Sequence, residues 1–165
     1  MVKPLQLKIL VAVCLLFTAS CGQSATPTPT TTFRDPDQEL VAAVAQAQST
    51  LSVLRGALLA PKPSYVFLGL KVRFTSSDGR TEDMWTEASY ILDNVYIVQM
   101  IEGVTLQRGA HPDRFVEIKP DQIIDWMIKE EDGTVHGGYT LRLDFGRMTP
   151  EQQQKYLEVT GYKFD

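Results

Sequence analysis

The alternation of residue types from Tyr65 to Thr75 constrains the fold of this chain more than any other feature. A period of two residues is that of a β-strand that turns one face to a core. Ser77-Asp78-Gly79 follows and is typical of a turn, so we expect a hairpin whose second strand runs from Thr81 to Tyr90. The apolar residues that we place on the core side of the first strand are Val66, Leu68, Leu70, Val72 and Phe74.

The same alternation fixes the register of this hairpin. The second strand must keep Met84, Thr86 and Ala88 on the core side, and a slip of one residue would turn all three to the other face. The pairs expected from this register are Met84 with Val72, Thr86 with Leu70, Trp85 with Lys71, and Asp83 with Arg73.

A helical pattern precedes the first strand. Asp35 and Pro36 suit the start of a helix, and Pro61 and Pro63 would end it. Apolar residues recur between them every three or four positions and form one stripe. We expect this stripe to pack on the sheet of the same domain; the alternative is a helix pair between two copies of the chain. The stripe consists of Leu40, Val44, Ala47, Leu51, Leu54 and Leu58.

Further strands are predicted after the hairpin. Leu92 to Val95 predicts a reversal into a strand that reaches Ile101, and Glu102 to Asp113 predicts a loop with at most a short strand. Glu131-Asp132-Gly133 is typical of a hairpin turn. The remaining strands are expected at Arg114 to Lys119, Ile123 to Lys129 and Thr134 to His136.

Two short helical segments are predicted near the C-terminus. Gly137-Gly138 interrupts a strand, and close backbone packing is the simplest reason for two glycines there. Tyr139 to Leu143 then predicts a helical turn, and the capping box at Thr149 predicts a last helix to about Val159. The expected fold class is therefore α+β: a mainly antiparallel β-sheet packed against a long N-terminal helix, with a short C-terminal helix.

Residues 1–20 have the composition of a bacterial export signal. Lys3 and Lys8 accompany an apolar run from Ile9 to Ala19 that is too short for a membrane span. Thr18-Ala19-Ser20-Cys21 resembles the lipobox of bacterial lipoproteins, although Thr18 stands where leucine is usual. We therefore expect removal of the signal peptide, acylation of Cys21, and an exported protein held to a membrane by its N-terminal lipid, facing the periplasm or the cell exterior. The alternative is an ordinary cleaved signal in which Cys21 has no role.

Residues 21–34 predict a Thr/Pro-rich tether, because they offer no large apolar side chain until Phe33 and proline stiffens the run. Residues 35–165 are then expected to form a single globular α+β domain. Cys14 lies in the signal, so the mature chain has no second cysteine for a disulfide and must rely on its core. The net charge of −4 at pH 7 argues against nucleic acid as a partner.

Several short motifs occur in an order that resembles a small bacterial family, domain of unknown function 2314, YegJ-like. The resemblance covers roughly Leu40 to Leu157 and implies a compact α+β domain with a mainly antiparallel sheet and no established activity. The chain departs from the family pattern between Ile91 and Arg114, and at Asp83, where histidine is common. The motifs are Gly69 to Phe74, Glu82 to Trp85, Ile124 to Met127, Gly137 to Arg142 and Met148 to Glu151.

The familiar catalytic motifs are absent from the sequence, which contains no serine elbow, phosphate-binding loop, zinc-type cysteine pair or His-Glu-x-x-His. His111 and His136 lie in unlike contexts, and we interpret them as a loop and a strand histidine. We therefore expect no cofactor and no metal. The enzymatic alternative is an envelope hydrolase that uses paired carboxylates from Glu82, Asp83 and Asp125, with Glu87 nearby.

The two tryptophans are the strongest candidates for a binding role. In the expected register, Trp85 lies on the face away from the helix, beside Lys71 and Arg73, where a cation–π contact is available. The alternative is that a loop or the last helix covers this ring. We predict that the protein acts by binding an unknown protein or small molecule and not by catalysis, with Lys71, Arg73, Trp85 and Trp126 as candidate binding residues.

Overall fold

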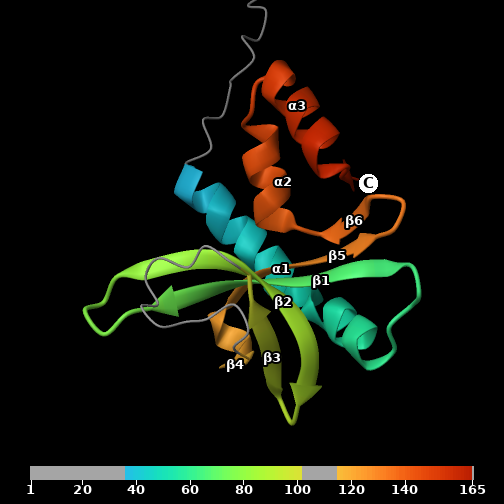
Figure 1. Ribbon diagram of the computed structural model, residues 1–165. Coiled ribbons are helices and arrows are strands. Elements are labelled where there is room, and N and C mark those ends of the chain that lie inside the picture. The colour runs from blue at the N-terminus through green and yellow to red at the C-terminus, as the bar shows by residue number, and fades with distance from the viewer. Residues whose placement is uncertain (1–35, 102–114, 165) are drawn as a thin grey trace, which may run out of the picture. The chain divides into compact units, whose positions relative to one another are not determined.

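The computed structural model describes residues 36–101 and 115–164 and has the expected α+β fold (Figure 1). A seven-stranded sheet has the order β4-β3-β2-β1-β5-β6-β7; every pair is antiparallel except β6 with β7. The helices are α1 (Pro36–Leu59), the 3-10 turn η1 (Pro120–Gln122), α2 (Tyr139–Gly146) and α3 (Pro150–Thr160). The strands are β1 (Tyr65–Thr75), β2 (Thr81–Leu92), β3 (Val95–Met100), β4 (Phe115–Ile118), β5 (Ile123–Glu130), β6 (Thr134–Gly137) and β7 (Lys163–Phe164).

The register of the β1–β2 hairpin is the one predicted from the alternation. All four predicted pairs are present: Met84 with Val72, Trp85 with Lys71, Thr86 with Leu70, and Asp83 with Arg73. Val72 is fully buried, whereas Lys71 is only partly buried, because the two residues point to opposite faces of the sheet. Trp85 therefore lies on the face away from α1.

Val66, near the start of β1, lies on the opposite side from the one that the alternation predicts, and its neighbour Tyr65, expected on the outer face, packs against the core instead. The Val66 side chain is 55% exposed, although we predicted it on the core side. The pairing of β1 with β5 shifts register between Tyr65 and Phe67. Such a bulge adds a residue on one strand and interrupts the alternation of side chains at that point.

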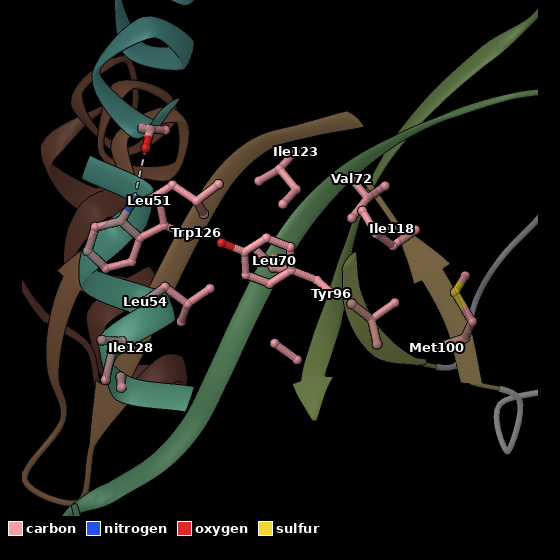
Figure 2. Packing of buried hydrophobic residues seen from close by; sticks show 14 of the residues in the cluster. Leu51, Leu54, Leu70, Val72, Tyr96, Met100, Ile118, Ile123, Trp126 and Ile128 are labelled. Carbon is pink, nitrogen blue, oxygen red and sulfur yellow. Dashed lines mark hydrogen bonds between the residues drawn. The ribbon is translucent and has the colours of Figure 1, made fainter. Parts of the chain in front are cut away.

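The apolar stripe of α1 packs on the sheet, as predicted. Leu54 is completely buried, and Ala47 and Leu51 are nearly so. Figure 2 shows Leu51 and Leu54 facing Trp126, Leu70 and Ile128 of the sheet. Full burial of a leucine side chain stabilises the folded state by about 1.5–3 kcal/mol relative to exposure. The helix stripe and the sheet face therefore form one core.

After β6 the structure differs from expectation in two elements. The predicted turn after Gly138 is a longer helix, α2, and β7 was not predicted because a strand of two residues has no measurable periodicity. The capping box of α3 is confirmed: the Thr149 hydroxyl accepts from the N–H of Gln152, whose side chain accepts from the N–H of Thr149. Figure 1 shows α2 and α3 side by side at the β5–β6 end of the sheet.

The two glycines before α2 are explained by their backbone conformations and, at Gly137, by close packing on Trp126. Gly137 has φ of +72°, and a Cβ atom there would collide with the backbone oxygen and the ring of Trp126. Gly138 has φ of +66°. Both conformations favour glycine, so this site needs no phosphate-binding role.

Several expectations concern residues outside those that the structure describes: the signal peptide, Cys21, the Thr/Pro tether, the loop from Glu102 to Asp113, and His111. They remain predictions. None of the helices in residues 36–101 and 115–164 has the length and apolar character that a membrane crossing requires.

Candidate functional site

A groove of about 470 Å³ opens on the face of the sheet that α1 does not cover. Its floor comes from β1, β2 and β5, and its wall from α2, α3 and the segment that leads to β7. Aromatic and aliphatic side chains make up nearly all of its lining. We call it the aromatic groove, and its residues are Val66, Phe67, Trp85, Ile101, Met127, Lys129, Leu141, Tyr156 and Tyr162.

The floor of the aromatic groove follows from the sheet register. Gly69 pairs with Met127 of β5 on one side of β1 and with Glu87 of β2 on the other. Since Gly69 has no side chain, the ring of Phe67 lies across the position that its Cβ would occupy. The Phe67 ring over Gly69 therefore forms part of the groove floor, together with Trp85 and Met127.

The wall of the aromatic groove belongs to an aromatic cluster that joins the last three elements. Tyr156 of α3 packs against Tyr162 with ring centroids 6.0 Å apart and against Phe145 of α2 at 5.8 Å. Phe164 of β7 contacts both Phe145 at 5.0 Å and Tyr162 at 6.1 Å. These contacts fix the position of Tyr156 and Tyr162 relative to the sheet.

Lys129 connects the wall to the floor. Its Nζ donates to the backbone oxygen of Thr160 at 3.1 Å and lies 5.0 Å from the centroid of the Tyr162 ring. Burial raises the pKa of the Tyr156 and Tyr162 phenols, so both remain neutral hydroxyls at pH 7. The aromatic groove thus combines an apolar surface with one ammonium and two hydroxyl groups.

Of the four predicted binding residues, only Trp85 lines the aromatic groove. Lys71 donates to the Thr140 hydroxyl at 3.2 Å, and Arg73 makes two bonds of 2.7 Å to the carboxylate of Asp83. Neither cation makes a cation–π contact with Trp85; the contacts of this kind within the described residues involve other rings. The partial burial of Trp85 agrees with the alternative interpretation, in which the C-terminal helices reach over this face.

Trp126 is a core residue and lies on the opposite face from Trp85. Its side chain is 2% exposed, and its Nε1 donates to the backbone oxygen of Ala47 in α1 at 3.0 Å (Figure 2). The ring also packs edge to face with Tyr139 at 6.1 Å. This tryptophan therefore anchors α1 to the sheet.

Asp125 holds the start of α2 against the sheet. The residue is fully buried, and its carboxylate accepts the backbone N–H groups of Trp126, Tyr139 and Thr140 and the hydroxyl of Thr140, at 2.8 to 3.1 Å. Burial raises the pKa of Asp125, and these four hydrogen bonds oppose that effect. The N–H groups of Tyr139 and Thr140 belong to the first turn of α2, so the carboxylate of Asp125 caps the N-terminus of this helix.

The carboxylates proposed for hydrolysis do not gather in one hollow. Asp83 is bound to Arg73, Asp125 is enclosed by α2, and Glu82 pairs with Phe74 on the other face of the sheet. None of the three lines the aromatic groove. Among the residues that the structure describes, no cluster of three or more His, Cys, Asp or Glu side chains is arranged to hold a metal.

A second hollow of about 500 Å³ lies beside α1, between Thr50, Trp126, Tyr139 and His136. Its polar groups already have partners within the protein. His136 Nε2 lies 2.8 Å from a carboxylate oxygen of Glu130, and Arg142 donates to the backbone oxygens of Gly137 and Val135. These groups serve the fold, so we favour the aromatic groove as the candidate functional site.

Sequence reasoning missed most residues of this site. Lys129, Leu141 and Tyr156 come from three elements, Tyr162 comes from the segment before β7, and the four have no common motif. The concentration of aromatic residues around α3, with Tyr156, Tyr162 and Phe164 within nine positions, is the only local signal. Trp85 was found because the register of its hairpin could be derived.

The fold and the groove together define a small α+β domain with an apolar, ligand-sized hollow on the open face of its sheet. Residues 37–164 match domain of unknown function 2314, a family described as an uncharacterized protein conserved in bacteria, and the chain belongs to this family. Neither the curated proteins nor the solved structures contain a match to the chain.

Proposed function

We propose that this protein is an exported bacterial lipoprotein whose domain binds a small apolar ligand in the aromatic groove. The observation that carries the proposal is the groove itself. Small-molecule sites are concave, are mostly apolar, and have volumes of roughly 300–1,000 Å³ with a few polar groups. The aromatic groove, at about 470 Å³, has this size and composition.

The construction of the groove supports binding more than catalysis. Among the described residues, its polar groups are one ammonium and two neutral phenols, and the lining that they form has no carboxylate, histidine, serine or cysteine. Such a set can orient a ligand, and it lacks the carboxylate or imidazole that most often serves as a general base. The hydrolase alternative would need Glu82, Asp83 or Asp125, whose present hydrogen bonds and positions keep them apart.

Export and lipidation are proposed from the N-terminal sequence. Lys3 and Lys8, the short apolar run and the small residues before Cys21 favour a lipoprotein signal. Cys21→Ser should give an unacylated, unprocessed precursor, whereas Cys14→Ser, a matched change within the signal, should leave processing intact. Mass spectrometry of the N-terminal peptide from both variants tests this, and an unacylated wild-type N-terminus would overturn it.

Ligand binding is tested with a neutral probe, naphthalene-2-methanol, titrated calorimetrically into the full chain. The expected result is saturable binding that Trp85→Ala weakens by about tenfold or more, because aromatic anchors contribute strongly at such sites. Tyr90→Ala is the matched control, since Tyr90 lies on the same strand, is 50% exposed and does not line the groove. Equal binding by both variants, or no binding by the wild type, would contradict the proposal.

A further inference from the structure

We propose that the natural ligand of the aromatic groove is a small molecule with an apolar body and one carboxylate, which binds Lys129. This inference rests on the proposed function and adds the chemical class of the ligand. It follows from the hydrogen bonds of Lys129, from the apolar surface around its ammonium, and from the position of that ammonium over the Tyr162 ring.

The Lys129 ammonium has more N–H donors than the described residues use. A lysine ammonium carries three N–H donors. Within the described residues, Nζ makes one hydrogen bond, to the Thr160 backbone oxygen, and one cation–π contact, to the Tyr162 ring. The backbone oxygen fixes the ammonium at the edge of the groove, and two of its N–H groups remain for water or a ligand.

Lys129 also lacks a carboxylate partner in the part of the chain that the structure describes. The nearby lysine on β7, Lys163, lies 3.9 Å from Asp132, whereas no carboxylate lies within 4.0 Å of Lys129. The surrounding groove surface is mostly apolar, so a bound ligand would remove water from the ammonium without replacing its hydrogen bonds. A ligand that supplies an anion at this point offsets that cost, whereas a neutral or cationic ligand does not.

The position of Lys129 indicates which end of the groove receives the anion. Its Nζ donates to the backbone oxygen of Thr160, two residues before Tyr162, and lies 5.0 Å from the centroid of the Tyr162 ring. The ammonium of Lys129 lies over Tyr162, so the carboxylate of the ligand belongs at the Tyr162 end and its apolar body extends toward Trp85.

The test uses three probes that share one apolar body and differ in charge. Naphthalene-2-carboxylate, naphthalene-2-methanol and protonated naphthalene-2-methylamine are titrated calorimetrically into the full chain. We expect the carboxylate to bind about tenfold or more tightly than the alcohol, because charge-assisted hydrogen bonds are stronger than neutral ones. We expect the ammonium probe to bind with the lowest affinity of the three. Added salt should weaken binding of the carboxylate more than that of the alcohol.

Two variants assign the effect to Lys129. Lys129→Met keeps an unbranched apolar stem and removes the charge, and it should lower the affinity for the carboxylate to that of the alcohol. Lys129→Arg should retain the preference. Lys155→Met is the matched control, because Lys155 is exposed on α3, does not line the groove, and gives the same change in net charge. Thermal melting checks that each variant is folded.

The outcomes separate this inference from the proposed function. Equal affinity for the alcohol and the carboxylate would overturn the choice of a carboxylate ligand and leave the groove as a binding site. A preference that persists in Lys129→Met but disappears in Lys155→Met would overturn the role of Lys129. Failure of all three probes to bind would overturn the proposed function as well.

Discussion

Thr140 gives both its backbone N–H and its hydroxyl to one oxygen of Asp125, each at 2.8 Å. Both residues are fully buried, and Lys71 donates to the same hydroxyl from β1. The contact joins the first turn of α2 to the middle of the sheet. It explains why Asp125, a candidate catalytic carboxylate in the sequence, has a structural role in the folded chain.

Asp125→Asn should destabilise the fold by about 2 kcal/mol or more. Both carboxylate oxygens accept hydrogen bonds from N–H or O–H donors, and the NH₂ group of asparagine would replace one of these acceptors with a donor. Asp83→Asn is the matched control, since it weakens a surface pair with Arg73 and should cost about 1 kcal/mol or less. Urea unfolding of both variants provides the measurement. Similar costs for the two changes would contradict the structural role of Asp125.

The pH dependence of stability should differ between the wild type and Asp125→Asn. Burial raises the pKa of Asp125 above its ordinary value of 3.8, so the folded state holds this proton to a higher pH than the unfolded state does. The contribution of Asp125 to the free energy of unfolding therefore falls as pH rises from the ordinary to the raised pKa.

Lowering the pH through this window should increase the stability difference between the wild type and Asp125→Asn, because asparagine does not titrate. Urea titrations at a series of pH values between neutrality and the ordinary pKa measure this difference. A difference that shrinks toward low pH would mean that the hydrogen bonds outweigh burial and that the pKa is lowered.

Leu54→Ala should cost about 2–5 kcal/mol, because it removes a completely buried side chain at the contact of α1 with the sheet and leaves a cavity. Val53→Ala is the control on the same helix; Val53 is 51% exposed, and we expect a change within about 0.5 kcal/mol. Thermal melting compares the two variants. If their midpoints of unfolding shift equally, the stripe of α1 is wrongly placed.

Gly133→Ala should destabilise the chain, because Gly133 has φ of +93° and a Cβ atom there would collide with the backbone oxygen of Gly161. The left-handed conformation alone costs a non-glycine residue about 1–2 kcal/mol. Gly56→Ala should have the opposite sign: its position in α1 is open and exposed, and alanine is favoured in a helix by about 0.5–1 kcal/mol. Differential scanning calorimetry compares the two, and a stable Gly133→Ala would contradict this close approach.

A chain that begins at Phe33 should fold with the same cooperative transition as the full chain. All elements from α1 to β7 are in residues 36–164, and the Thr/Pro run before them offers no large apolar side chain to their core. Circular dichroism during heating measures the transition of both chains. A lower midpoint for the shorter chain would show that the N-terminal residues contribute to the fold.

The sequence determined the features that depend on local periodicity and local backbone geometry. The alternation from Tyr65 and the turn at Gly79 were enough to set the β1–β2 register and to place Trp85 on the face away from α1. The spacing in α1 and the capping box at Thr149 likewise predicted elements that the structure confirms. Such features follow from interactions between residues that are close in the chain or directly paired.

The tertiary structure decided which residues share a site. In the sequence, Trp126 and Trp85 are both candidate binding residues. In the structure, Trp126 pairs with Leu70 and is therefore buried between the sheet and α1. The sequence also could not show that α3 brings Tyr156 and Tyr162 opposite Trp85. Burial and long-range packing depend on how whole elements dock, and local residue patterns do not determine that docking.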